Sequence, residues 1–168
     1  MSSLIALVRR AILPLLVSVP LALALTASAL ATGTAATRAS NGFGERAPVR
    51  IGVSGPFSGP SAPMGLSMRE GIRIAAAEIN AGGGLLGRRV ELVERDDEAS
   101  NELGAQIVRE FVNRERVVAG LGIVNTGVAL ASQRHYQTAR IPVITSVATG
   151  NLITRQFQPP EFPENYVF

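Results

Sequence analysis

The sequence predicts an α/β fold, a parallel, Rossmann-like sheet flanked by helices. Short apolar runs that end in glycine or in polar turns alternate with segments of helical periodicity, which is typical of parallel sheets. The chain has 168 residues, of which 46% are hydrophobic, enough to form one core. The clearest unit runs from Val117 to Thr149 in the order strand, polar turn, helix, strand, polar turn.

The first 31 residues predict a cleaved secretory signal peptide. Arg9 and Arg10 precede an almost wholly apolar run, Ala11 to Leu25, and small residues in the A-x-A pattern follow at 27–31. A transmembrane anchor of about 20 residues is the alternative. Two prolines within the apolar stretch and its small-residue end favour cleavage. Export places the mature protein in a periplasm or outside the cell.

Residues 32–48 predict a flexible lead-in, because they are rich in Ala, Thr, Ser, Asn and Gly and have no apolar periodicity. The alternating run Val49 to Ser54 predicts the first strand, and a loop with three prolines follows at 55–65. Residues 66–80 predict a helix that ends at a glycine run. Its apolar face is predicted from the spacing of Met68, Ile72, Ala75 and Ile79.

The glycine-rich stretch Gly82 to Gly87 does not fit a phosphate-binding loop. Such a loop follows a strand and opens a helix, whereas this stretch follows a helix and precedes a predicted strand, Arg89 to Arg95. No GK[ST] run occurs anywhere in the chain. A helix stop with a turn is therefore the better interpretation, and no cofactor is expected. The alternating residues 90–94 favour a strand towards the edge of the sheet.

The acidic run Asp96 to Glu98 follows this strand. A metal cluster is one interpretation, but three adjacent carboxylates point in different directions, so a solvated turn near the next helix is favoured. Ser100 is the predicted N-cap of that helix, which extends to Asn113 with a Glu110–Arg114 pair on its surface. The residues expected in its buried face are Leu103, Ile107, Val108, Phe111 and Val112.

In the central unit, Val117 to Gly120 predicts a buried strand, and Thr126 is a plausible N-cap for a helix at 128–139. Pro142 disfavours the helical conformation at the residue before it, so the helix is expected to stop before Pro142 and the strand 142–145 to begin. A crossover of this kind is right-handed, so both polar turns are expected at the carboxyl edge of one parallel sheet. Open α/β sheets bind ligands at this edge.

Two hydroxyl groups, of Thr126 and Thr149, would meet there with the unpaired N–H groups of a helix N-terminus. This combination predicts a site for a small anion such as a carboxylate. The structural alternatives remain open at this point: Thr126 can be only a helix cap, and Thr149 only a turn residue.

Several function classes are disfavoured by composition. The formal net charge is +3, and the basic residues are scattered without interleaved aromatics, so no nucleic acid is expected as a partner. The chain has no cysteine, which excludes disulfides and cysteine catalysis. His135, the single histidine, has no acidic neighbour in the predicted helix. With no nucleophile–base pair and no phosphate loop, an enzyme is not expected.

An ordered set of motifs resembles the leucine/isoleucine/valine-binding family of ABC-transporter substrate-binding proteins, the type I periplasmic-binding fold. The resemblance covers residues 49–168. The motifs are Ile51-Gly52-Val53, Pro56-Phe57-Ser58-Gly59-Pro60, the helix Gly71 to Asn80, Gly82-Gly83-Gly84, Asp96-Asp97, Thr126-Gly127-Val128-Ala129, Ile141-Pro142-Val143-Ile144 and Ala148-Thr149. Each motif is weak by itself, and their order makes the set specific.

The resemblance implies a binding protein that delivers an amino acid or similar small polar solute to an ABC permease in the inner membrane. It places the ligand carboxylate on the turn Asn125-Thr126-Gly127, where many members carry serine in place of Thr126. It places further contacts on Val147, Ala148 and Thr149, and it packs Met64 on the ligand side chain. A ligand-sensing receptor or regulator of the same fold is the alternative function.

The family has two lobes, so the resemblance also implies that residues 49–168 form an incomplete first lobe, as in a fragment. Acidic and aromatic residues of a second lobe would hold the ligand's ammonium group. An incomplete lobe predicts bare apolar edges, which favour association.

Overall fold

The computed structural model describes residues 46–168. The predicted signal peptide and most of the lead-in lie outside these residues. Within the part that is described, no helix is long and apolar enough to cross a membrane.

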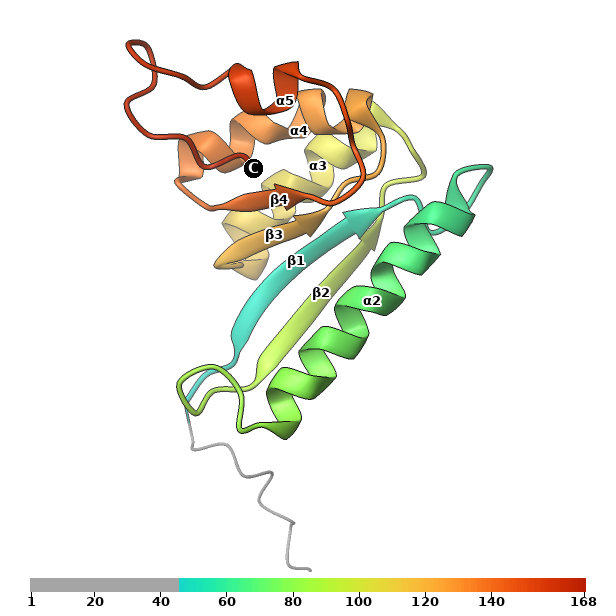
Figure 1. The fold of residues 1–168 in the computed structure, drawn as a ribbon, viewed down its shortest axis with the longest axis vertical. Helices are drawn as coiled ribbons and strands as arrows, with labels where there is room; N and C mark the ends of the chain where they lie inside the picture. The colour runs from blue at the N-terminus through green and yellow to red at the C-terminus, as the bar shows by residue number, and fades with distance from the viewer. Residues whose placement is uncertain (1–45) are drawn as a thin grey trace, which may run out of the picture. The chain divides into compact units, whose positions relative to one another are not determined.

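The sheet has four parallel strands in the order β2-β1-β3-β4 (Figure 1). This arrangement confirms the predicted parallel α/β sheet, and it confirms that the second strand lies at an edge. The strands are β1 (Val49–Gly55), β2 (Val90–Asp96), β3 (Ala119–Gly122) and β4 (Val143–Thr145).

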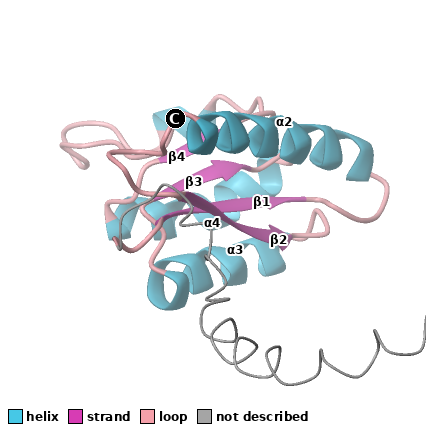
Figure 2. Ribbon diagram, turned by 90° about the horizontal axis from the view of Figure 1, so that it is seen from below, coloured by secondary structure: helices cyan, strands magenta, loops and turns pink. Residues whose placement is uncertain are grey.

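Helices cover the two faces of the sheet unequally, as Figure 2 shows. One face carries a single long helix, α2, and the opposite face carries α3, α4 and a short π-helix between them in sequence. A last helical turn, α5, follows β4. The bounds are α2 (Ala62–Ala81), α3 (Asn101–Glu110), π-helix (Phe111–Glu115), α4 (Thr126–Ala139) and α5 (Leu152–Arg155).

Two strand glycines bring the α3–α4 layer close to the sheet. A Cβ atom added at Gly52 would lie 2.6 Å from the ring of Phe111, and one added at Gly120 would lie 2.6 Å from the ring of Tyr136. Both rings are buried, at 0% and 1% exposed. The absence of side chains at the two glycines therefore leaves the space that these aromatic rings fill in the core.

The face that carries α2 is covered less completely. Strand residues alternate between faces, so Leu121 and its register partner Ile144 point to this side. Leu121 lies half-buried beside α2, but Ile144 on β4 is 52% exposed. An apolar strip of the sheet is therefore open to solvent over β3 and β4.

The helix α2 begins four residues earlier than the sequence predicted, at Ala62 instead of Leu66. Pro63 lies in its first turn, where the fixed φ of proline fits and its missing N–H is not needed. Gly65 lies against the carbonyl of Pro56, too close for any side chain. Met64 is thus a helical residue and not part of a loop.

The predicted buried face of this helix is only partly correct. Gly65 and Ala76 are its buried residues, and they lie against the rest of the fold. The predicted residues Met68, Ile72, Ala75 and Ile79 line an open groove on the side of the helix instead. The spacing identified an apolar stripe but could not show how much of it the sheet covers.

Two boundaries in the middle of the chain also differ from prediction. The strand predicted at 117–120 is β3 at Ala119–Gly122, because Val117 still closes the preceding turn by donating to the carbonyl of Phe111 at 3.1 Å. The helix predicted to reach Asn113 changes to a π-helix at Phe111. Ser100 caps α3 as predicted, accepting from the N–H of Leu103 at 3.3 Å.

The surface pair predicted between Glu110 and Arg114 is wrong. Glu110 pairs with Arg95 of β2 at 2.7 Å, and Arg95 also pairs with Glu115 at 3.0 Å. Glu115 pairs in turn with Arg50 of β1 at 2.7 Å. The wider π-helical turn changes the side-chain spacing, so these acids are directed to the strands.

The C-terminal residues return to the sheet beside β4. The N–H of Phe168 donates to the carbonyl of Val143 at 2.9 Å, and the N–H of Thr145 donates to the carbonyl of Phe168 at 2.7 Å. Gln137 of α4 holds this segment by donating to Glu164 and accepting from Tyr166. Val143 and Val167 also form an isolated parallel bridge.

Candidate functional site

The turn between β3 and α4 has an unusual backbone. Gly122 has φ 119° and Ile123 has φ 62°, a left-handed conformation that is rare for a β-branched residue. The N–H of Ile123 donates to the carbonyl of Ser54 at 2.9 Å, and the Ile123 side chain is only 1% exposed. Burial and this hydrogen bond therefore hold a strained turn in place. Sequence reasoning missed this strain, since nothing in the residue pattern indicates a left-handed isoleucine.

The helix α4 begins one residue before the position predicted from Thr126 as N-cap. Asn125 is the N-cap residue: its backbone is extended, and its carbonyl accepts from the N–H of Ala129 at 3.0 Å. Thr126 is instead the first helical residue. The Asn125 side chain makes no hydrogen bond to the helix, so no side chain caps the start of α4.

The N–H groups of Thr126, Gly127 and Val128 precede the first intrahelical bond and have no acceptor in the helix. They lie at the positive end of the helix dipole. Gly127 is exposed, and the Thr126 side chain is half-buried. The turn thus presents backbone donors and a hydroxyl group to solvent at the carboxyl edge of the sheet.

The second polar turn, between β4 and α5, touches the first. The N–H of Ser146 donates to the carbonyl of Gly122 at 2.8 Å. A Cβ atom added at Gly150 would lie under 3.0 Å from Cγ2 of Thr126 and 3.5 Å from its Oγ1. The two turns that the sequence predicted to converge therefore lie against each other.

Within the second turn, Val147 and Ala148 are half-buried and Thr149 is exposed. Met64 lies apart from this turn, in the first turn of α2, and is 54% exposed. Met64 and Val147 line one groove, of about 770 Å³, while Thr126, Gly127, Ala148 and Thr149 do not line it. Five of the six predicted ligand-binding residues therefore lie in the two touching turns. The sixth, Met64, lines the same groove as Val147.

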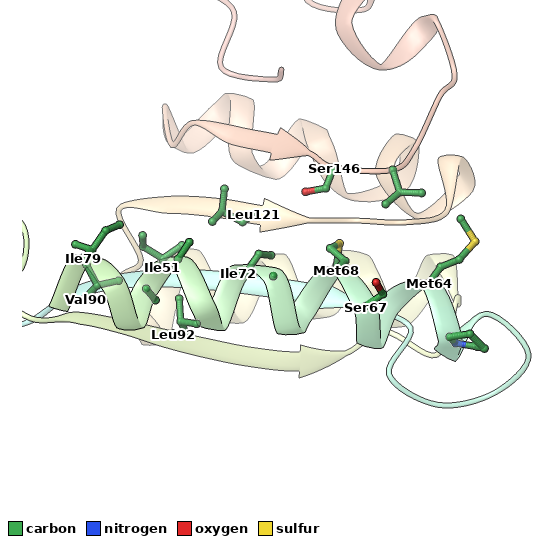
Figure 3. A pocket seen from close by; sticks show the side chains of 15 residues that line it. Ile51, Met64, Ser67, Met68, Ile72, Ile79, Val90, Leu92, Leu121 and Ser146 are labelled. Carbon is green, nitrogen blue, oxygen red and sulfur yellow. The ribbon is translucent and has the colours of Figure 1, made fainter. Parts of the chain in front are cut away.

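The groove runs along α2 from Met64 to Ile79, between the helix and the open face of the sheet (Figure 3). Its walls contain no charged residue, and Ser67 and Ser146 supply its side-chain hydroxyls. The remaining lining residues are apolar or glycine: Ile51, Pro63, Met68, Gly71, Ile72, Ala75, Ala76, Val90, Leu92, Leu121 and Val147. One end of the groove therefore adjoins the β4–α5 turn, and its length follows α2 over β1, β2 and β3.

The acidic run at the end of β2 is not the solvated turn that the sequence predicted, because Asp97 is 0% exposed. Burial raises the pKa of Asp97 to about 6. Burial also opposes ionisation of Asp96, but hydrogen bonds from Ser58 and from the N–H groups of Glu98 and Phe57 outweigh it and lower the Asp96 pKa. Residues 46–168 contain no cluster of three His, Cys, Asp or Glu that could hold a metal ion.

His135 lies half-buried on α4, away from both turns in sequence. Its Nε2 lies 3.3 Å from Nη1 of Arg109 on α3. Burial and the charge of Arg109 lower the pKa of His135. A cationic neighbour does not make histidine a stronger base, so this pair offers no nucleophile–base arrangement.

With this geometry established, sequence comparison assigns the family. A family model described as periplasmic binding protein matches residues 48–168. The chain belongs to the periplasmic binding protein family. The match covers the whole described fold except its first two residues, and it includes both turns of the candidate site.

Individual relatives agree with this assignment. The chain is 32% identical to the Leu/Ile/Val-binding protein homolog 7 of Brucella suis over 132 residues, which are 79% of this chain and 31% of that protein. It is 30% identical to an amino acid binding protein of Pseudomonas aeruginosa over 110 residues, 66% of this chain and 29% of the relative.

Solved structures give the same result. The branched-chain amino acid transporter substrate binding protein LivJ from Streptococcus pneumoniae, in complex with isoleucine, aligns with a TM-score of 0.63 and 28% identity. That alignment covers 65% of this chain and 31% of LivJ. An ABC transporter substrate-binding protein from Sphaerobacter thermophilus aligns with a TM-score of 0.64 and 30% identity, over 72% of this chain and 31% of that one.

These alignments confirm the predicted type I periplasmic-binding fold and the resemblance to Leu/Ile/Val-binding proteins. They also show that the chain spans about a third of the length of the relatives it matches. The relatives are solute-binding proteins by name.

Proposed function

We propose that this chain supplies part of the ligand site of an ABC-transporter substrate-binding protein, for an amino acid or a similar small polar solute. The observation that supports this most directly is the contact between the two turns. It brings the Thr126 hydroxyl and the unpaired N–H groups of α4 to one place at the carboxyl edge of the sheet. The similarity to Leu/Ile/Val-binding proteins supports the choice of ligand class.

The ligand carboxylate is proposed to sit on the N-terminus of α4. One oxygen accepts from the Thr126 hydroxyl and from the exposed N–H of Gly127. The other oxygen accepts from Thr149, and the backbone of Val147 and Ala148 frames the turn. Each hydrogen bond to a charged carboxylate contributes on the order of 1.5–3 kcal/mol, more than a neutral hydrogen bond does.

The ligand side chain is proposed to face Met64. Met64 and Val147 form one end of the apolar groove, next to the proposed carboxylate position. Methionine is flexible and polarisable, so this wall adapts to aliphatic side chains of different shapes. The ammonium group of an amino acid finds no acid at the two turns, since neither turn contains an acidic residue. Its partner is proposed to come from a second lobe.

The biological setting is proposed from the same family membership. The segment 1–31 acts as an export signal, the mature protein acts in the periplasm, and an ABC permease in the inner membrane receives the solute. In the complete protein two lobes would close on the ligand by a hinge motion. The protein has no catalytic role in this scheme.

The test is a calorimetric titration with a panel of amino acids and small amides. The relatives are about three times as long, so we suggest a chimera in which residues 48–168 replace the matching part of the Brucella suis relative. Thr126→Ala should weaken binding roughly tenfold to a hundredfold, the equivalent of one charge-assisted hydrogen bond. Thr126→Ser keeps the hydroxyl group and should bind nearly as well as the parent chimera.

The unmodified Brucella suis protein is the control for a functional second lobe. Met64→Ala should change the order of preference among side chains more than it changes carboxylate recognition. If Thr126→Ala and Thr149→Ala both bind the best ligand as tightly as the parent chimera, the carboxylate site lies elsewhere.

A further inference from the structure

The loop between β2 and α3 encloses a carboxyl group of which only one oxygen accepts a hydrogen bond. Asp97 is 0% exposed. Its Oδ1 accepts from the N–H of Ala99 at 3.0 Å, whereas its Oδ2 is buried without a hydrogen-bond partner among the described residues. A buried carboxylate oxygen without a donor is unfavourable, because it has lost its hydrogen bonds to water and formed none within the protein.

The backbone around this group is held in a rare conformation. Glu98 and Ala99 are consecutive non-glycine residues with φ 50° and 57°, and L-residues adopt this region only at a cost. Two carboxyl oxygens hold them there. Oδ1 of Asp96 accepts from the N–H of Glu98 at 2.9 Å, and Oδ1 of Asp97 accepts from the N–H of Ala99.

Burial favours the neutral acid over the carboxylate, and it outweighs the hydrogen bond from Ala99, which favours the carboxylate. A proton on Oδ2 removes the charge from the unpartnered oxygen, and Oδ1 remains an acceptor for Ala99. The ionised form leaves a charged oxygen buried without a donor. It is relieved only if water enters or if the side chain swings out, and swinging out breaks the bond to Ala99.

We propose that Asp97 is a proton-operated latch on the loop of residues 96–100. The neutral carboxyl holds Ala99 in its left-handed conformation and keeps the loop closed, and the carboxylate releases it. The strained backbone, the buried side chain and the unpartnered Oδ2 define this latch, which does not depend on the proposed ligand.

The charged groups around Asp97 do not compensate its charge. Asp96, the preceding residue of β2, acts on it by repulsion. Glu98 and Glu102, in the loop and the first turn of α3, are also acidic. The segment 55–58, whose Gly55 carbonyl accepts the Asp97 N–H at 3.0 Å, carries no charged side chain. The arginines of β2 and α3 have other partners: Arg95 pairs with Glu110, and Arg109 lies beside His135. The charge that acts on Asp97 is therefore that of Asp96, which favours the neutral form of Asp97.

The loop of residues 96–100 is connected to the candidate site through the start of α3. The carbonyl of Asp97 accepts the N–H of Ser100 at 2.7 Å, and Ser100 is the N-cap of α3. The next residue, Asn101, lies against Gly127 of α4: a Cβ atom added at Gly127 would be 2.7 Å from Oδ1 of Asn101. Release of the loop would therefore loosen the start of α3 beside the β3–α4 turn.

The experiment is a pH titration of the full chain, labelled with ¹³C and ¹⁵N, by NMR. The Asp97 carboxyl carbon should titrate with a midpoint near 6, about two units above an ordinary aspartate. The Ala99 amide signal should follow the same midpoint. In Asp97→Asn, which carries no titrating group, the Ala99 signal should stay constant across this range.

The control variant is Glu98→Gln, which removes a neighbouring acid from the same loop and leaves the latch intact. It should keep the midpoint of the Ala99 signal near 6. A carboxyl carbon of Asp97 that titrates near 4 would overturn the proposal, and this measurement needs only the parent chain. An Ala99 signal that still titrates near 6 in Asp97→Asn would overturn it as well.

Discussion

The substitution Gly150→Ala tests the contact between the two turns. The Gly150 backbone is not in the left-handed region, so alanine can adopt its conformation. The new Cβ atom would nevertheless lie under 3.0 Å from Cγ2 of Thr126, whereas ordinary contacts are 3.4–4 Å. The methyl group must therefore move away by roughly half an ångström or more. Overpacking of this kind typically costs about 1–3 kcal/mol.

A second substitution separates this clash from other effects of alanine. Thr126→Ser removes Cγ2 but keeps the hydroxyl oxygen, which would lie 3.5 Å from the new Cβ atom, an ordinary contact distance. Gly150→Ala should therefore be nearly harmless in the Thr126→Ser background. The coupling energy between the two substitutions should be about 1 kcal/mol or more.

Urea denaturation of the four proteins of this cycle measures the free energy of unfolding. Gly150→Ala alone should lower the free energy of unfolding, and the double variant should recover it. If Gly150→Ala destabilises both backgrounds equally, or neither, the two turns do not touch as described. The convergence of Thr126 with the second turn would then be lost as support for the ligand site.

Three further predictions concern other parts of the chain. Gly71→Ala should stabilise the fold by about 0.5–1 kcal/mol in urea denaturation, because Gly71 lies within α2 and no atom is within 4 Å of the added Cβ. Gly52→Ala should destabilise the fold, because its Cβ would meet the ring of Phe111. The raised pKa of Asp97 means that the folded state binds its proton more tightly than the unfolded state. Stability should therefore rise by about 1 kcal/mol more in the parent than in Asp97→Asn as pH falls from 7 to 5. Mass spectrometry of the exported protein should find an N-terminus near Thr32, and an intact Met1 on membrane-held protein would contradict cleavage.

The sequence was sufficient to predict the sheet and the meeting of the two turns. Apolar runs with polar ends marked all four strands, and the fixed hand of the crossover placed both turns at one edge. This information is local or topological, so a single sequence contains it. The N-cap of α4 was assigned one residue late because both Asn125 and Thr126 are residues that favour this position.

Long-range packing could not be predicted in the same way. The periodicity of α2 showed an apolar stripe, but it could not show that Ala76 is buried while Ile79 is 40% exposed. The acidic run at Asp97 was expected in solvent because carboxylates are seldom buried. Asp97 is tied to Gly55 of β1 and to Ser100 at the start of α3 by backbone hydrogen bonds, which no local pattern reveals. The left-handed Ile123 likewise depends on contacts from β1.

The central claim is that the start of α4 binds a carboxylate, and NMR of the ¹⁵N-labelled chain tests it most directly. NMR detects weak binding, so the chain can be titrated by itself with leucine and, in parallel, with leucinamide, which lacks the carboxylate. We predict saturable shifts of the Thr126, Gly127 and Val128 amide signals with leucine, and much smaller shifts with leucinamide. Equal shifts with both compounds, or saturable shifts confined to residues away from the two turns, would contradict the claim.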